Sequence, residues 1–445
     1  MAPEQPPILE LDNWSLMRRS GGLEVCLLEN INLSIQGGRW LAVLGSNGSG
    51  KSSLLKFLAS EDSPLKHDAA IMFQDPDDQI VASTSARELA LGRPNLDTTA
   101  LLAEFGLQGL EDLDPRLLSA GQKQRLVLAV ALAGGPDVLL ADEPTALQDP
   151  DQAVWILNRL RSWLAQPGHT LVTATCDRRE AAMADDLLVL ENGRVVLFGR
   201  SRELMDDARV VALVGEEKPS LPDLKPSVKM PGETEPLLQI SNLKCLFRGP
   251  TQGFFLDQLS VAPGQRLGIT GSNGCGKSTL LGAIAGARKP DSGVVQLGGR
   301  ALYRRHNLDL DHGLAMLAPQ FPEYLFTRET VAAEIAVDPA LESFNAQDFL
   351  EKLGLSPELA QRNPHSLSSG QRRRLALGMV LFSCRALLLL DEPTAALDLQ
   401  GRRRVLELLA QLPANVGLIL ASHHEDFLQE AGCSILNLDN HPLES

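Results

Sequence analysis

The chain has 445 residues, which suggests two or three domains, and 44% of them are hydrophobic, enough to fill globular cores. Its formal net charge of −15 argues against nucleic acid as the main partner, because phosphate binding needs clustered Lys and Arg. The six cysteines include no CxxC pair, so neither a zinc site nor a redox pair is expected.

The N-terminal residues MAPEQPPILELDNW contain neither the basic nor the apolar region of a signal peptide. The longest apolar run, around residues 127–133, is far shorter than the roughly 20 residues that a membrane-spanning helix needs. If the protein serves transport, we expect the membrane path to lie in another chain.

The sequence contains an internal repeat. Three motifs recur in the same order: GSNGSGKS as GSNGCGKS, LSAGQ as LSSGQ, and LLADEPTA as LLLDEPTA. One domain has therefore been duplicated. We expect the domains at residues 1–215 and 237–445, joined by a linker at 216–236, because its dense prolines prevent helix continuation and favour an extended spacer.

Both halves predict an α/β fold. Apolar runs such as WLAVLG and LVTAT, or RLGITG and LILAS, indicate buried strands, and periodic stretches such as residues 122–133 indicate helices. Strands that alternate with helices predict a mostly parallel sheet in each half.

Each half begins with the phosphate-binding pattern GxxxxGK[ST]. Glycines let backbone N–H groups face phosphate oxygens, and the following helix presents its positive N-terminus. Lys51 and Lys277 would reach the β- and γ-phosphates of ATP, and Ser52 and Ser278 would bind Mg²⁺. The candidate residues are Gly45, Ser46, Asn47, Gly48, Ser49, Gly50, Lys51, Ser52 and Ser53, and Gly271, Ser272, Asn273, Gly274, Cys275, Gly276, Lys277, Ser278 and Thr279.

A pair of carboxylates ends an apolar strand in each half, in VLLADE and LLLLDE. Asp142 and Asp391 suit the water shell of the metal. Glu143 and Glu392 suit orienting or deprotonating the attacking water. The two motifs together predict two sites that hydrolyse ATP with Mg²⁺.

The LSAGQ and LSSGQ sequences between these motifs resemble the signature of the ABC ATPase family, over nearly the whole chain. The resemblance implies two P-loop NTPase cassettes, each with a mostly parallel core sheet, a small antiparallel β-subdomain and a helical subdomain. It also implies composite sites, in which the signature of one cassette caps the ATP held by the other. The implied nucleotide-binding residues are Ser119, Gly121 and Gln122 for the site of Lys277, Ser368, Gly370 and Gln371 for the site of Lys51, and Asp149 and Asp398. Ala120 and Ser369 depart from the signature, and we expect them to weaken the capping.

The resemblance assigns Gln74 and Gln320 to the sensing of Mg²⁺ and the γ-phosphate. It places His423 against the γ-phosphate in the second half, where the first half has Cys176. A thiol is no equivalent hydrogen-bonding substitute for imidazole. We therefore expect the site of Lys277 to hydrolyse ATP faster than the site of Lys51.

Two further differences separate the halves. Phe247 is the candidate for stacking on adenine in the second half, whereas the first half offers Leu16 and Arg18, with Trp14 nearby. The first half also lacks a stretch like KPDSGVVQLGGRALY, which reads as a β-hairpin, so its antiparallel subdomain should be trimmed. Within the second phosphate loop, we expect the thiolate of Cys275 to be favoured by the neighbouring lysine and the helix N-terminus.

The sequences after Gln74 and Gln320, FQDPDDQIVASTSARELALG and APQFPEYLFTRETVAAEIAV, resemble those of energy-coupling factor (ECF) transporter ATPases. This resemblance implies an importer of vitamins or transition metals, with a transmembrane scaffold subunit and a substrate-binding membrane subunit in other chains. The chain would lie peripherally on the cytoplasmic face of the cell membrane, with Asp77, Asp78 and Glu323 near the docking surface. A soluble fused protein that acts on ribosomes or nucleic acid, and a sugar-importer tandem ATPase, are the alternatives.

Overall fold

A computed structural model describes residues 7–20, 23–65, 68–146, 148, 150–214, 236–248, 252–303, 314–341, 344–383, 385–395, 397 and 399–443. The chain divides into two compact units, Met1–Glu217 (unit 1) and Lys218–Ser445 (unit 2). All but the last residue of the expected linker lies outside the described residues. Among the described residues, no helix combines the length and the apolarity that crossing a membrane requires.

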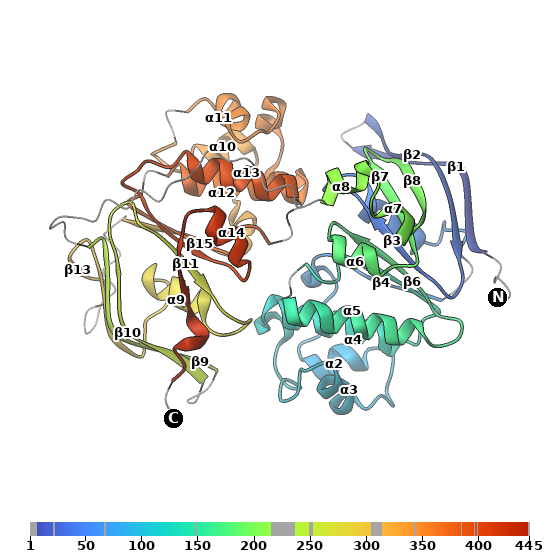
Figure 1. Ribbon diagram of the computed structural model, residues 1–445, viewed down its shortest axis with the longest axis horizontal. Helices are drawn as coiled ribbons and strands as arrows, with labels where there is room; N and C mark the ends of the chain where they lie inside the picture. Colours follow the sequence, from blue (N-terminus) through green and yellow to red (C-terminus); the bar gives the residue numbers. More distant parts are fainter. Residues whose placement is uncertain are drawn as a thin grey trace. The chain divides into compact units, whose positions relative to one another are not determined.

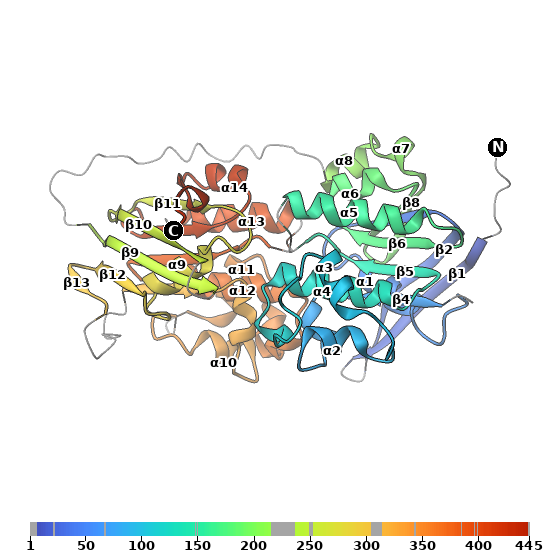
Figure 2. The same ribbon diagram turned by 90° about the horizontal axis from the view of Figure 1, so that it is seen from below.

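Unit 1 contains a two-stranded antiparallel ribbon and a six-stranded sheet in the order β4-β5-β6-β3-β7-β8. The strands are β1 (Pro7–Ser20), β2 (Leu23–Gln36), β3 (Trp40–Leu44), β4 (Ala69–Met72), β5 (Val138–Asp142), β6 (Thr170–Thr175), β7 (Asp186–Glu191) and β8 (Arg194–Arg200). All neighbours in the sheet are parallel except β7 and β8. Figure 2 shows β4, β5 and β6 side by side.

The helices of unit 1 connect these strands. They are α1 (Lys51–Leu58), α2 (Ser85–Ala90), α3 (Thr98–Glu104), α4 (Ala120–Ala133), α5 (Pro150–Leu164), α6 (Arg178–Met183), α7 (Ser201–Leu204) and α8 (Ala208–Val214), with short 3-10 turns at Pro76–Asp78 and Pro115–Leu117. Buried leucines of α1 share one apolar cluster with the inward side chains of β1, β2 and the central strands. The helix that follows the phosphate loop is therefore held from both sides.

Unit 2 contains a four-stranded sheet in the order β10-β9-β12-β13 and a parallel five-stranded sheet in the order β14-β15-β16-β11-β17. The strands are β9 (Leu238–Arg248), β10 (Gln252–Val261), β11 (Arg266–Thr270), β12 (Ser292–Leu297), β13 (Arg300–Ala301), β14 (Ala315–Ala318), β15 (Leu387–Asp391), β16 (Gly417–Ala421) and β17 (Ser434–Asn437). The hairpin β12–β13 has no counterpart among the described strands of unit 1.

The helices of unit 2 are α9 (Lys277–Ile284), α10 (Val331–Ile335), α11 (Ala346–Lys352), α12 (Ser369–Leu381), α13 (Leu399–Ala410) and α14 (Glu425–Glu430), with 3-10 turns at Pro322–Leu325, Pro357–Gln361, Pro364–Ser366 and Leu438–Asn440. In Figure 1, α9 lies near the long strands β9 and β10, and its leucines share their apolar cluster.

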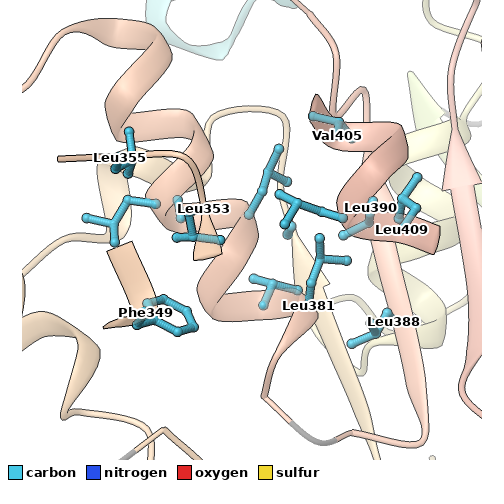
Figure 3. Close-up of a cluster of buried hydrophobic side chains, with 14 of the residues drawn as sticks. Phe349, Leu353, Leu355, Leu381, Leu388, Leu390, Val405 and Leu409 are labelled. Carbon is cyan, nitrogen blue, oxygen red and sulfur yellow. The ribbon is translucent and has the colours of Figure 1, made fainter. Parts of the chain in front are cut away.

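A second cluster of unit 2 joins the helical subdomain to the parallel sheet. Figure 3 shows Leu381 of α12 near Leu388 and Leu390 of β15, and Phe349 of α11 belongs to the same cluster on the side of the helical subdomain. All four side chains are at least 96% buried. Burying a side chain of this size stabilises the fold by about 1.5–3 kcal/mol, so α12 is firmly seated on the strand that ends in the carboxylates. The two α/β units confirm the predicted fold class.

Candidate functional site

Each phosphate loop connects a buried strand to a helix. Gly50 precedes α1 with φ of 107°, and Gly276 precedes α9 with φ of 111°. A Cβ on Gly50 would lie only 2.7 Å from Leu28 Cδ2, so glycine is required there for both its φ and its size. The sequence pattern thus builds the same turn twice.

The loop lysines are held in matching positions. Lys51 Nζ donates to Gly45 O at 2.7 Å and to Ser46 O at 3.1 Å. Lys277 Nζ donates to the corresponding carbonyls at 2.7 and 3.2 Å. Both lysines are at least 93% buried. Each places a cation beside backbone N–H groups at a helix start, which is an arrangement that binds phosphate.

The expected metal residues lie at the ends of the central strands. Asp142 ends β5 and Asp391 ends β15, and each has a buried Oδ1 without a hydrogen-bond partner. Burial raises the pKa of Asp142, and it raises the pKa of Asp391 to about 6, while hydrogen bonds from Ser52 and Ser278 act in the opposite direction.

These oxygen groups fit Mg²⁺, which takes one or two carboxylates and keeps waters and phosphate oxygens as its other ligands. The described residues contain no cluster of three or more His, Cys, Asp or Glu that could hold an ion by itself. Asp142 with Ser52, and Asp391 with Ser278, would hold the ion, and it would neutralise phosphate charge when bound.

The two glutamates adopt an unusual backbone conformation. Glu143 has φ of 50° and Glu392 has φ of 46°, and a side chain in this left-handed region costs on the order of 1 kcal/mol or more. In both units the glutamate N–H donates at 2.9 Å to the carbonyl of an alanine, Ala174 or Ala421, on the neighbouring strand. The strained turn aims each carboxylate away from the end of its strand and beside the phosphate loop.

In unit 1 the carboxylate of Glu143 is held by neutral donors. Gln74 Nε2 donates to Oε2 at 2.9 Å, and Cys176 Sγ donates to Oε1 at 3.2 Å. Burial raises the pKa of Glu143, and the charge of Lys51 offsets this only in part. The neutral form of this acid is therefore more stable, relative to the ionised form, than it is in water.

In unit 2 the carboxylate of Glu392 has different partners. The backbone N–H of His423 donates to Oε1 at 3.1 Å, and the ring Nδ1 of the same residue lies within hydrogen-bond distance of Oε2, also at 3.1 Å. Ser422 Oγ donates to Oε2 at 3.2 Å. Burial acts to raise the pKa of Glu392, but His423 and Lys277 outweigh it, so the pKa lies below its ordinary value. This acid is kept ionised, as a general base must be.

The signature residues begin a helix in each unit. Ser119 accepts from Gln122 N, and Gln122 Oε1 accepts in return from Ser119 N at 3.0 Å. Ser368 and Gln371 form the same capping box. Both glutamines, which were expected to contact nucleotide, therefore cap their own helices. Gly121 and Gly370 lie in the first turns, whose N–H groups have no intrahelical partner, and such N–H groups can receive an anion.

The other expected residues are either outside the described part of the chain or contact protein groups. Asp149 and Asp398 lie outside the described residues, and Phe247 is described only as backbone of β9. Trp14 stacks on Phe57 of α1 with ring centroids 3.9 Å apart, so it packs within unit 1. Gln320 lies after β14, where its carbonyl accepts from a buried arginine.

Two expectations were wrong. The thiolate of Cys275 is not favoured, because burial raises the pKa of the thiol by more than Lys277 lowers it. Glu323 is no exposed docking charge, because it is 93% buried and pairs with Arg373 at 3.5 Å. This arginine was not among the predicted site residues, and neither was Glu180, which is buried and contacts Thr173 and Thr175 of β6. The only sequence signal for Arg373 was its place in the RRR triplet after the second signature.

Comparisons with known proteins agree with this geometry. The sequence model of the family described as "ABC transporter" matches residues 28–146 and 257–395, together more than half of the chain. A proposed ABC transporter ATP-binding protein of Bacillus cereus is 29% identical over 90% of this chain and 84% of its own length. A proposed HMP/thiamine import ATP-binding protein of Bacillus subtilis is 27% identical over 93% of this chain and 86% of its own. A third relative, from Bifidobacterium longum, is 28% identical over 89% of this chain, which spans 61% of that protein.

Among solved structures, the model of ribosome-bound archaeal Pelota and ABCE1 has a TM-score of 0.65 at 21% identity, covering 88% of this chain and 71% of that one. At this identity the likeness concerns the fold. The family match and the two phosphate loops lead to one conclusion: the chain belongs to the ABC transporter family, as a tandem ATP-binding protein with ATPase activity.

Proposed function

We propose that this chain is the ATP-hydrolysing subunit of an ABC importer of the ECF type, which takes up vitamins or transition metals through membrane subunits in other chains. The observation that carries the proposal is the pair of loops after Gln74 and Gln320. Their sequences resemble those of ECF ATPases, and the similarity to the Bacillus subtilis thiamine-import protein supports the same class.

These loops are braced in the same way in both units. Glu88 Oε2 accepts from the N–H groups of residues 81 and 82 at 3.0 and 2.6 Å. Glu334 Oε2 accepts from residues 327 and 328 at 2.8 and 2.6 Å. Both glutamates are at least 95% buried, so each loop is held firmly to its helical subdomain. A braced loop suits docking, because little ordering is needed when a partner binds.

The braced loops expose apolar side chains. Val81 is 76% exposed in unit 1, and Leu325 is 62% exposed in unit 2. Asp77 and Asp78 are also exposed, although Asp77 pairs with Lys123 at 2.6 Å. We infer that unit 1 offers a membrane partner both an acidic and an apolar contact, which would aid orientation. Unit 2 would rely on its apolar contact, since Glu323 is buried.

We further infer two composite and unequal ATP sites. The site of Lys277, Glu392 and His423 would be completed by the signature of unit 1 and would hydrolyse faster. The site of Lys51 and Glu143 would be completed by the signature of unit 2 and would mainly hold ATP. Measuring ATPase of Glu143→Gln and Glu392→Gln separately tests this inference. A much larger loss in Glu392→Gln is expected, and equal losses would contradict it.

The importer role is tested by purifying the tagged full chain from membranes. Small hydrophobic subunits should accompany it, and the double variant Val81→Asp with Leu325→Asp should lose them while keeping soluble ATPase activity. Phe198→Asp, at an exposed position of β8, is the matched control and should retain the subunits. Co-sedimentation with ribosomes in place of membrane subunits would overturn the proposal and favour the translation-related alternative.

A further inference from the structure

The buried arginine of the signature helix in unit 2 joins three parts of the ATP site. Arg373 lies on α12, five residues after Ser368, and is 97% buried. Its guanidinium donates from Nη2 to Gln320 O and from Nη1 to Ala395 O. Its Nε lies 3.5 Å from Glu323 Oε2, and its Cζ lies 5.2 Å from the ring centre of Phe321.

The partners of Arg373 belong to two functional segments outside its own helix. Residues 320–323 form the turn after β14, which we call the sensor turn of unit 2. Ala395 follows Glu392 closely, and its N–H donates to Glu392 O at 3.1 Å. The planar guanidinium group of Arg373 therefore connects the signature helix, the sensor turn and the turn of the expected general base. Only arginine has enough donors in a fixed geometry to make all of these contacts.

Unit 1 makes these connections with other residues. The residue five positions after Ser119 is Gln124, which donates to Glu143 O at 3.0 Å and accepts from Gln148 Nε2 at 3.0 Å. The acid of its sensor turn, Asp77, pairs instead with Lys123 on the neighbouring helix position, and its side chain is 44% exposed. In unit 1, two residues, Gln124 and Lys123, thus make the connections that the single buried Arg373 makes in unit 2.

We propose that Arg373 is a positioning residue that couples the sensor turn and the signature helix to Glu392, so that the three segments of unit 2 move together. A buried ion pair is a poor source of stability, because desolvation offsets its attraction. Its geometric specificity is a better reason for placing an arginine there. The pair of unit 1, in which the Asp77 side chain is 44% exposed, is screened by salt more strongly than the buried pair of unit 2. This inference rests on the ATPase activity of the family and not on the importer role.

The test uses the full chain in the Glu143→Gln background, in which the Glu392 site reports alone. Arg373→Gln should lower kcat on the order of tenfold, because small misplacements of catalytic groups are costly, while KM for ATP changes by less than about twofold. Arg373→Lys should have a higher kcat than Arg373→Gln, since lysine keeps the positive charge but lacks the planar guanidinium group. Arg374→Gln is the matched control, because that guanidinium bonds Gly370 O and Gly354 O instead.

Two further measurements separate positioning from simple stability. Adding Glu323→Gln to Arg373→Gln should cause little further loss of kcat, because both changes break one connection. If Arg373→Gln does not fold, replacing Arg373 and Glu323 by Met keeps the volume without a buried charge, and kcat should again fall. An unchanged kcat in a folded Arg373 variant, an equal loss in Arg374→Gln, or fully additive losses with Glu323→Gln would overturn the proposal.

Discussion

A buried acid in unit 1 allows a quantitative prediction about stability. Glu180 on α6 is completely buried, and Thr145 Oγ1 donates to its Oε2 at 3.1 Å. Burial raises the pKa of Glu180 from 4.5 to about 8, although hydrogen bonds from Thr173, Thr145 and Thr175 act against it. We consider the variant Glu180→Gln, which keeps the shape of the side chain and removes its titration.

The sign of the effect follows from proton binding. Between pH 4.5 and about 8 the folded chain holds a proton on Glu180 that the unfolded chain has lost. The free energy of unfolding of unit 1 therefore falls as pH rises through this window, by at most about 1.4 kcal/mol per pH unit. At pH 7 the free energy of unfolding is therefore lower by about 3 kcal/mol than it would be without this titration, and Glu180→Gln should recover much of that difference.

Tryptophan fluorescence reports this effect selectively. All four tryptophans lie in unit 1, at positions 14, 40, 155 and 163, so the signal follows unit 1 even if the two units unfold separately. Urea unfolding of the full chain should be measured from pH 5 to pH 9. Glu203→Gln, on an exposed part of α7, is the control for the loss of one carboxylate.

We expect Glu180→Gln to have a higher free energy of unfolding than the parent, by a difference that is small at pH 5 and grows up to about pH 8. A difference in the free energy of unfolding that stays constant from pH 5 to pH 9 would refute the reasoning, because a constant difference reflects packing and not titration. A variant that is less stable at every pH would show that the ionised carboxylate is needed by its hydroxyl partners.

Three further predictions concern the ATP sites. In the Glu392→Gln background, Cys176→His should raise ATPase several-fold, since imidazole is a stronger hydrogen-bond partner than a thiol; an equal or lower rate with normal ATP binding would contradict this. The glutamate that remains is Glu143 in the variant Glu392→Gln and Glu392 in the variant Glu143→Gln. Because the pKa of Glu143 is raised and that of Glu392 is lowered, the acid limb of the pH–rate profile should lie at higher pH for Glu392→Gln. Superimposed profiles would contradict this. Asp391→Asn should stabilise unit 2 by about 3 kcal/mol at pH 7 in EDTA, since this pH lies above the raised pKa of about 6, and it should weaken Mg²⁺-dependent ATP binding; a destabilised variant would oppose this.

The sequence predicted those parts of the fold and site that depend on local chemistry. A phosphate loop needs glycines and a lysine at fixed spacing, and a strand that ends in two carboxylates needs only a short apolar run. The sequence also favoured a shorter antiparallel part in the first half, because Lys51 and Gln74 are 23 positions apart whereas Lys277 and Gln320 are 43 apart; the described strands of unit 1 include no counterpart of β12–β13. In each case, residues near each other in sequence determine the outcome.

The remaining features depend on burial and on contacts between distant residues. Glu323 seemed a surface acid by its loop sequence, but its arginine partner is 50 residues away. The thiol of Cys275 lies beside a lysine as expected, yet the surrounding side chains exclude enough water to raise its pKa. Neither degree of burial can be read from sequence neighbours, because tertiary packing sets it.

The surroundings of the glutamate differ between the two units. The phosphate-loop lysines and the glutamate N–H groups make corresponding hydrogen bonds in both units, so the backbone geometry is shared. Where unit 2 has His423 against the carboxylate, unit 1 has Cys176, and the pKa of the glutamate shifts in opposite directions. Burial alone cannot explain this contrast, since it acts to raise the pKa in both units. The exchange of His423 for Cys176 therefore contributes to the opposite pKa directions, while the turn that positions the carboxylate is the same in both units.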